Sequence, residues 1–402
     1  MGLAVASPAM HRAIRLRSPG HPSVVLFACL FASQSAMLVL SPTLVEVAHD
    51  LGVSTATAGQ LRSISGATGG ITALVLATAA RRPGLRELLS AGAALVAVGS
   101  GLSAAAPSFT VLAAAQAVLG VGIGLLVAVG IAASGEWPAP PERPQVLAWA
   151  IAGMPAAWIV GMPVIGAVAD TGWRPAWTAV PGAAGLLALA LVRIRPPDAP
   201  SRRTGDAAGA WRRPAVARFA AGELLANAAW AGVLTYSGAL LLESYAISPT
   251  VAALGLGLMA TAMLPGTFTA RRRAAHATPA LLAGLTAFQA TAVLAVCAVR
   301  LSAGVTLALL ATMAFVNGRR SMAASALGMD SAPEDRVAAM SMRAAANQLG
   351  YLLGAAAGGL ALALGGFPAL GVTLAALFAT AVLIHLTAPV NTPTPVPHQA
   401  TA

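Results

Sequence analysis

The sequence contains very little charge and no lysine. Asp, Glu, Lys and Arg together make up 9% of the 402 residues, whereas hydrophobic residues make up 57%. A soluble protein carries about a quarter charged residues, so this shortage excludes a mainly soluble chain and predicts a polytopic membrane protein. The missing lysine also excludes ATP hydrolysis at a P-loop, because that phosphate-binding loop requires a lysine.

Cysteine is nearly absent too, and the motifs of common enzyme sites are missing. Cys29 and Cys297 both lie in apolar segments and lack the spacing of metal ligands, so we expect them to be small buried apolar side chains. The sequence holds no HExxH helix, no GxSxG elbow with an exposed His and no CxxC pair. It therefore predicts neither an enzyme nor a cofactor or metal site.

Long apolar runs are what the sequence has in abundance. About 20 apolar residues cross a bilayer as a helix, and runs of this length are too long for the strands of a membrane barrel. The pattern predicts an all-α membrane protein with twelve transmembrane helices. Their approximate bounds are 22–44, 57–79, 88–106, 108–133, 146–168, 176–193, 216–241, 250–269, 278–299, 303–328, 337–364 and 367–387.

All 24 basic residues are arginine, and the formal net charge is +11. A basic chain is compatible with nucleic-acid binding, but these arginines gather in short clusters in alternate loops, which favours the lipid bilayer as the partner and no nucleic acid. By the positive-inside rule, Arg-rich loops face the cytoplasm. With an even number of spans, we expect both termini on the cytoplasmic side of the cell membrane.

The longest polar interruption divides the chain into two halves. Residues 194–215 are rich in Pro, Gly and Arg, which predicts a flexible cytoplasmic linker. The expected organisation is a cytoplasmic segment (1–21), a six-helix bundle (22–193), this linker, a second six-helix bundle (216–388) and a disordered cytoplasmic tail (389–402).

The two halves resemble each other at one constant offset. Arg143 aligns with Arg336, Gly135 with Gly328, Gly161 with Gly354, and Gly166 with Gly359. Tandem six-helix pseudo-repeats are typical of transporters whose binding site lies between the halves, near the bilayer midplane.

Three stretches in this order resemble the major facilitator superfamily, and within it the bacterial drug and sugar efflux permeases of the arabinose type. They are "LSPTLVEVAHDLGVSTATAGQLRS" (40–63), "GMPVIGAVADTGWRPAW" (161–177) and "PEDRVAAMSMRAAANQLGYLLGAAAGG" (333–359). The resemblance covers the whole chain and implies the major facilitator fold and proton-driven efflux. It also implies that the motif with Gly161, Pro163 and Gly166 helps the two halves rock.

Two positions depart from that family's pattern. The loop after the second span carries Arg81, followed by Arg82, where the family usually has an acid before its arginines. The fourth span carries Gln116 where the family often has an embedded arginine. The departures put the usual charge relay and proton coupling in doubt. We keep both arginines as gating candidates and Gln116 as a candidate substrate ligand.

The tenth apolar run contains Asn317, Arg319 and Arg320. A charge at the bilayer centre costs about 2.5–3.5 kcal/mol. A helix that ended at Gly318 would leave the arginines in a cytoplasmic loop, but the internal repeat places Arg320 well inside the span. We favour the second interpretation. Arg320 and Asn317 then share one helix face, and these residues together with Arg319 are candidates for binding an anionic substrate group.

Glu223 is the one carboxylate that we place inside a span. It shares a polar stripe of the seventh helix with Asn227 and Trp230, which are candidate substrate ligands. Glu223 is either a protonatable coupling site or the partner of Arg320 or Arg343 in a structural ion pair, and the sequence leaves both open.

Other polar side chains inside spans complete the candidates for substrate binding. Arg343, Asn347 and Tyr351 recur every four residues on the eleventh span, and Gln34 interrupts the first. Each either faces a substrate or forms a hydrogen bond between helices. Arg62, near the outer end of the second span, is expected to snorkel toward the interface.

The function predicted from these features is secondary active transport, most simply by a monomer. The cargo would be a small organic molecule, anionic if the arginines bind it, and the coupling ion a proton. The alternatives are an uncoupled facilitator or importer, and a transport-inactive homologue that serves as a membrane sensor or assembly partner.

Overall fold

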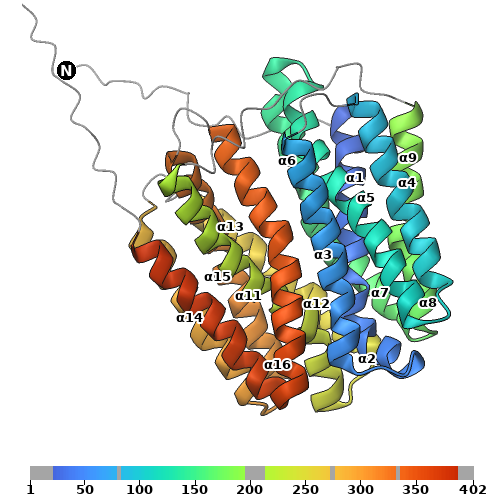
Figure 1. Ribbon diagram of the computed structural model, residues 1–402, viewed down its shortest axis with the longest axis vertical. Helices are drawn as coiled ribbons and strands as arrows, with labels where there is room; N and C mark the ends of the chain where they lie inside the picture. The colour runs from blue at the N-terminus through green and yellow to red at the C-terminus, as the bar shows by residue number, and fades with distance from the viewer. Residues whose placement is uncertain (1–20, 79–82, 195–212, 272–276, 332–335, 388–402) are drawn as a thin grey trace, which may run out of the picture.

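The structure is a computed structural model that describes residues 21–78, 83–194, 213–271, 277–331 and 336–387. The regular elements in these ranges are all helices, and they form two bundles side by side (Figure 1). The N-terminal bundle contains α1 (His21–Leu38), α2 (Leu40–Asp50), α3 (Thr55–Thr78), α4 (Leu85–Ala104), α5 (Phe109–Glu136), α6 (Arg143–Ala156), α7 (Met162–Ala169), α8 (Trp173–Trp177) and α9 (Ala183–Ile194). The C-terminal bundle contains α11 (Pro214–Tyr245), α12 (Pro249–Thr261), α13 (Met263–Arg271), α14 (Pro279–Ala298), α15 (Ala303–Ser331) and α16 (Arg336–Leu386).

Judged by length and composition alone, nine helical segments of the described ranges could cross a membrane. Two further helices of sufficient length, α3 and α15, carry buried arginines inside them. One of the nine segments belongs to α16, which contains two passes. The helices therefore accommodate the twelve predicted spans, and the predicted all-α membrane fold is confirmed.

Helix α16 turns back on itself at a pair of glycines. Its 51 residues would measure about 77 Å if straight, more than twice the roughly 30 Å of bilayer hydrocarbon. The backbone leaves helical geometry at Gly365 and Gly366, and Gly366 has φ 63°, a left-handed conformation that favours glycine. The bend falls between the last two predicted spans, and its two arms diverge from the lower end of Figure 1.

Two helix boundaries refine the sequence prediction. The first span is longer than expected, because α2 continues it to Asp50 after a break at Val39. Pro42 in α2 lacks an N–H and leaves the carbonyl of Leu38 without its usual partner, which explains a break here. Helix α15 continues to Ser331, so the alternative in which the tenth span ends at Gly318 is wrong.

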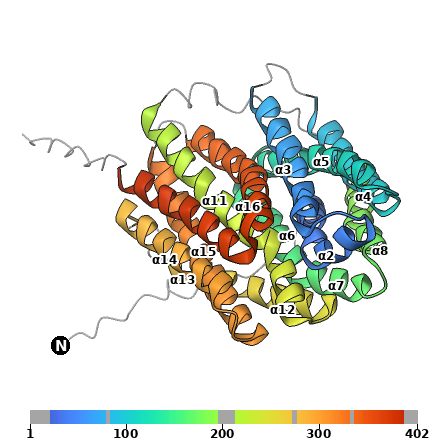
Figure 2. The ribbon, with the colours of Figure 1, turned by 60° about the horizontal axis from the view of Figure 1, so that its bottom comes forward.

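The two bundles are joined at one end of the molecule, which comes forward in Figure 2. Helices α2, α7 and α12 meet there, whereas the first turn of α6 and the last turn of α9 lie at the opposite end (Figure 1). Hydrogen bonds join the bundles at this end, among them Ser41 Oγ to Leu234 O (3.0 Å), Thr55 Oγ1 to Glu243 Oε1 (2.7 Å), and Thr250 to the Asp170 carboxylate, with N to Oδ1 at 3.3 Å.

Small residues let the helices of opposite bundles approach closely. A Cβ at Gly166 of α7 would lie 2.2 Å from the Cβ of Ala253 on α12. Pro163 of the same motif lies beside Gly257 of α12. On the other side of the interface, α3 packs on α16 at Gly66, where a Cβ would lie 2.7 Å from the backbone nitrogen of Leu352. The close contact between the bundles therefore requires glycine at these positions, because a larger side chain would collide with the opposite helix.

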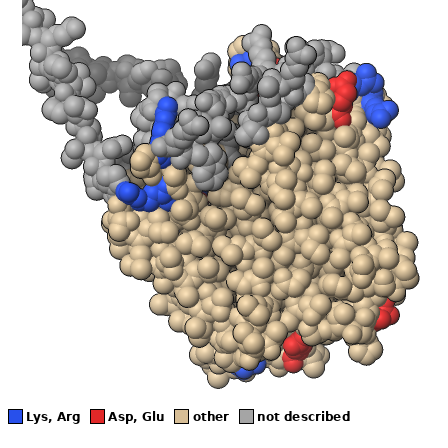
Figure 3. All heavy atoms as spheres, in the orientation of Figure 1, with Lys and Arg blue, Asp and Glu red and all other residues tan. Residues whose placement is uncertain are grey.

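The outer surface fits a lipid environment. On the face shown in Figure 3, charged side chains lie near the upper and lower ends, and the broad middle shows none. Large apolar side chains such as Leu258, Leu301 and Leu364 are exposed. In water such a surface would be a liability, but lipid tails solvate it.

The close approach of α11 and α16 yields the first prediction. A Cβ at Gly354 would lie 1.9 Å from the carbonyl oxygen of Ala228, so Gly354→Ala forces two helix backbones apart. We expect it to lower the free energy of unfolding by about 1–3 kcal/mol. Thermal melting of the purified protein in detergent measures this loss.

Gly284→Ala is the matched control, since a Cβ on that residue of α14 meets nothing within 4 Å. Alanine is the better helix former, so its melting temperature should match or exceed that of the wild type. Equal melting temperatures for both variants would contradict the packing described here.

Candidate functional site

A cluster of charged side chains lies inside the C-terminal bundle, between α11, α15 and α16. At its centre is Glu223, which is fully buried. Its Oε1 lies 2.6 Å from the Arg320 NH1, and its Oε2 accepts a hydrogen bond of 3.0 Å from the Arg343 Nε. One carboxylate therefore serves two guanidinium groups, and the structural ion pair considered for Glu223 is present.

Amide side chains satisfy the rest of the Arg320 guanidinium. Its NH2 donates to Asn227 Oδ1 at 3.1 Å, and its Nε donates to Asn317 Oδ1 at 3.3 Å. Gln289 of α14 donates to the same Asn317 oxygen at 3.3 Å. All three nitrogens of Arg320 thus have partners, which is what a cation that is only 1% exposed requires.

Helical periodicity explains how the cluster assembles. Glu223 and Asn227 are four residues apart on α11, and Asn317 and Arg320 are three apart on α15, so each pair shares a helix face. The predicted shared face of Arg320 and Asn317 is therefore observed. Because the cluster holds two arginines and one carboxylate, it keeps a formal charge of +1 when His385 is neutral.

Two further groups border the cluster. The Arg343 NH2 also donates to Ser321 Oγ at 3.0 Å, and the Arg343 side chain is 17% exposed. His385, on the second arm of α16, places its Nε2 3.9 Å from Glu223 Oε1. The cluster thus connects five helix segments of one bundle: α11, α14, α15 and the two arms of α16.

A second polar position lies at the boundary between the bundles. Arg62 of α3 is 1% exposed and donates from NH2 to the backbone oxygen of Met37. Its guanidinium carbon lies 6.0 Å from the ring centroid of Tyr351 in the other bundle. The expectation that Arg62 snorkels outward is therefore wrong, because the side chain points into the contact between α3 and α16.

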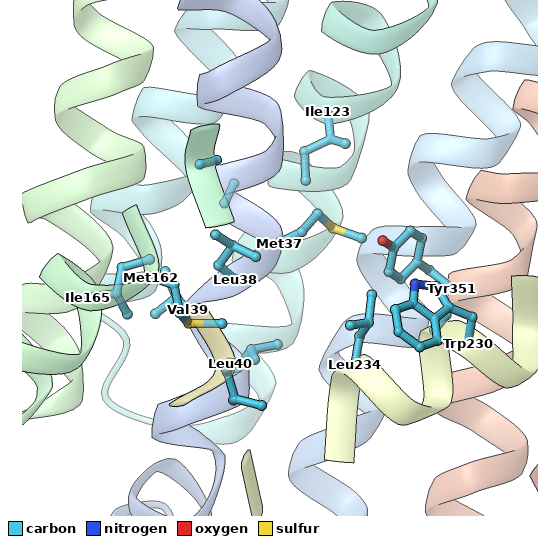
Figure 4. Close-up of a cluster of buried hydrophobic side chains, with 14 of the residues drawn as sticks. Met37, Leu38, Val39, Leu40, Ile123, Met162, Ile165, Trp230, Leu234 and Tyr351 are labelled. Atoms are coloured by element: carbon cyan, nitrogen blue, oxygen red, sulfur yellow. The ribbon is translucent and has the colours of Figure 1, made fainter. Parts of the chain in front are cut away.

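Apolar and aromatic side chains surround this position. In Figure 4, Met37 of α1 points toward Tyr351 of α16 and Trp230 of α11, and Leu234 lies beside them. All four side chains are buried. Two predicted substrate ligands, Trp230 and Tyr351, are therefore brought together at the interface, one helical turn or more from the charged cluster that holds Asn227.

The other predicted residues occupy separate places. Gln116 is buried inside the N-terminal bundle, where its Nε2 donates to Ser103 Oγ at 3.0 Å. Gln34 is buried on α1, while Arg319 and Asn347 are half-buried. In this conformation Gln116 stabilises the packing of α4 against α5.

The residues predicted to take part in gating also lie in different places. Gly166 and Pro163 lie at the contact with α12, as described above, whereas Gly161 packs within its own bundle beside Val180. A π-helical turn, Ala157–Gly161, precedes α7 and follows Pro155, which frees a backbone carbonyl. Arg81 and Arg82 lie outside the described residues.

Sequence reasoning missed Gln289, Ser321 and His385, and it misjudged Arg62. The first three are single polar residues in apolar segments, where the sequence does not show which distant helix supplies a partner. Arg62 did leave a signal, since it is a basic residue inside a span, and charges in such places normally mark a functional position.

Two helical bundles joined at one end, with polar groups at and beside their boundary, define a two-domain membrane transporter. The sequence profile described as Major Facilitator Superfamily matches residues 26–339. The chain belongs to this superfamily, whose members are membrane transporters rather than enzymes.

Individual relatives are distant. An uncharacterised MFS-type transporter, YbcL of Bacillus subtilis (strain 168), is 24% identical over 169 residues, which span 42% of this chain and 43% of that protein. The fold is similar to a bacterial homologue of the human lysosomal transporter Spinster, in an inward-facing and occupied conformation (TM-score 0.68, 14% identity, 91% of this chain and 94% of that one). It is also similar to a POT family transporter in complex with a thioalcohol-conjugated peptide (TM-score 0.72, 14% identity, 90% and 95%). At this identity the two structures establish the fold alone.

The charged cluster yields the second prediction. Glu223→Gln leaves two buried guanidinium groups without their carboxylate, and breaking a buried pair costs about 3–5 kcal/mol. We expect both Glu223→Gln and Arg320→Gln to lower the melting temperature strongly. The double variant should lose clearly less than the two single losses combined, as measured by a double-mutant cycle in detergent.

The control is Glu243→Gln, which removes an exposed carboxylate from the same helix, α11. Its loss should be small, since exposed ion pairs and hydrogen bonds contribute little. Strict additivity of the Glu223 and Arg320 losses would contradict the direct coupling of these two side chains.

Proposed function

We propose that this transporter exports a small organic molecule across the cytoplasmic membrane by alternating access, in exchange for protons. The observation that carries the proposal is the joint between the bundles at one end. It consists of a few side-chain hydrogen bonds and close glycine contacts, which can separate without unfolding either bundle. Rocking of two such repeats about a fixed site is how this architecture moves a substrate.

The distribution of arginine supports an orientation. The Arg-rich segments adjoin the helix ends opposite the joint, and such segments favour the cytoplasm. The joint would then face the outside, with both termini in the cytoplasm. An exporter takes up its cargo from the cytoplasm, so a state closed toward the outside is the loading state of its cycle.

Glu223 is the candidate for proton coupling. It accepts from Arg343 on the first arm of α16, and the same arm packs against α3 of the other bundle at Gly66. A proton on Glu223 would remove the charge that holds Arg343. Proton binding would in this way be linked to the position of α16, and hence to the contact between the bundles.

Uncoupled facilitation is a second candidate function. Its support is that Glu223 is already engaged as the counter-ion of two arginines. A pH-sensitive dye inside proteoliposomes separates the two: an exporter moves protons when its cargo is added, and a facilitator moves cargo alone. Glu223→Gln should abolish the proton movement and leave downhill exchange of cargo.

Cross-linking across the joint provides the third prediction. Thr55 and Glu243 form a side-chain hydrogen bond of 2.7 Å between the bundles, so a short bifunctional maleimide should join cysteines at these positions readily. The two native cysteines are buried and are replaced by serine beforehand. A transported compound should slow the cross-linking, because it populates the state in which this end is open. Gel mobility after timed treatment with the maleimide measures the rate.

A cysteine pair within one bundle is the control. Asp50 and Arg174 form an ion pair of 2.5 Å at the same end of the molecule, both in the N-terminal bundle. Asp50 also accepts a hydrogen bond of 3.0 Å from Trp173 Nε1, and the hydrogen bonds from Arg174 and Trp173 lower the pKa of Asp50. Cross-linking at this pair should not respond to transported compounds. A Thr55–Glu243 pair that never responds to any compound would contradict alternating access and favour a transport-inactive protein.

A further inference from the structure

Arg62 is a buried cation without an anionic partner. Its side chain is 1% exposed, and its Nε and NH1 have no hydrogen-bond partner. Among the described residues, no carboxylate lies within ion-pair distance of its guanidinium. Its contacts are the Met37 carbonyl and the face of the Tyr351 ring. Three N–H donors, one on Nε and two on NH1, are therefore left unused.

The contrast with Arg320 shows how unusual this position is. Both arginines are equally buried, but Arg320 has a carboxylate and two amide oxygens around it. An uncompensated buried charge is expensive, and proteins normally pair it or do without it. A site that keeps such a charge in the absence of a partner is therefore prepared for a partner that comes from outside the chain.

The surroundings of Arg62 describe that partner. Arg62 contacts Met37 and Tyr351, and in Figure 4 these two side chains lie beside Trp230 and Leu234, with which they form an apolar and aromatic wall. The Tyr351 hydroxyl has no hydrogen-bond partner within the described part of the chain, so it offers a further polar contact. A guanidinium beside aromatic faces recognises a carboxylate attached to an apolar or aromatic body. An inorganic anion would leave that wall unused.

We propose that Arg62 binds the carboxylate of an amphipathic organic anion between the two bundles, and that this anion is the cargo. The inference rests on the proposed transport function and names its substrate class. Arg62 belongs to the N-terminal bundle, and Tyr351 and Trp230 belong to the C-terminal one, so a bound anion would contact both bundles. Neighbouring side chains cover the free nitrogens in this conformation, so an anion that enters from the cytoplasmic side must displace these side chains to reach them.

Thermal shift of the purified protein in detergent tests this site, with benzoate as the probe and benzamide as its neutral isostere. A ligand that binds the native state stabilises it by RT ln(1 + [L]/Kd), so at one concentration a tighter ligand raises the melting temperature more. We expect benzoate to stabilise the wild type and benzamide not to do so. Arg62→Gln should weaken benzoate binding by at least about tenfold, and sulfate should stabilise neither protein.

The same variant gives a second readout without ligand. Because Arg62→Gln removes an uncompensated charge, the unliganded variant should melt at the same temperature as the wild type or above it. An arginine with a structural role predicts the opposite, a lower melting temperature. Arg218→Gln is the matched control, since that arginine is exposed and donates to the Thr387 carbonyl, away from the boundary between the bundles. It should bind benzoate like the wild type.

Three results would overturn the proposal: no stabilisation of the wild type by benzoate, equal stabilisation by benzamide, or unchanged benzoate binding by Arg62→Gln. If Arg62→Gln does not fold, Arg62→Lys decides, because it keeps the cation but not the planar donors. It should prefer benzoate over benzamide with weakened affinity, and a loss of that preference would also overturn the proposal.

The cross-linking of Thr55 and Glu243 keeps the two proposals separate. If neutral compounds slow that cross-linking while Arg62→Gln binds benzoate normally, transport stands and the assigned substrate class fails. If benzoate binds through Arg62 but never changes the cross-linking, the anion site stands and alternating access fails.

Discussion

Charges inside a bilayer must find their partners within the protein, and this constraint organises the whole molecule. Water does not reach the hydrocarbon to solvate a guanidinium or a backbone carbonyl. Helices satisfy the backbone, and the side chains of α11, α15 and α16 satisfy one another around Glu223. The rest of the C-terminal bundle follows from this cluster, because helices that share a buried ion pair cannot slide or rotate independently.

The two bundles meet the constraint differently. The C-terminal bundle surrounds Arg320 with oxygen atoms, so every nitrogen of its guanidinium has a partner before any ligand arrives. The N-terminal bundle contributes Arg62 at its boundary and supplies only a carbonyl and an aromatic face from across the interface. Internal repeats therefore gave two halves of the same architecture but unequal electrostatics. The half in which Arg320 has its partners provides rigidity. The boundary at which Arg62 lacks an anionic partner provides a place where a ligand changes the energy of the closed state.

The sequence contained most of the fold and only part of the site. Apolar length predicted the spans, the break between the runs 337–364 and 367–387 placed the last turn, and the repeat placed Arg320 inside its helix. Each of these is a local or periodic signal. The partners of Glu223 are 97 and 120 residues away along the chain, and no periodicity encodes which distant face meets it. The burial of Arg62 was not predictable for the same reason, since its neighbours come from the distant helices α1 and α16.

The bend in α16 has a mechanical consequence. Its two arms are joined by Gly365 and Gly366 alone rather than by a loop, so the end of the first arm cannot move far from the start of the second. The first arm rests on α3 of the opposite bundle, and the second holds His385 beside Glu223. The interface with α3 and the far side of the ion pair are therefore linked through one covalent joint of two residues, although the two places share no side chain.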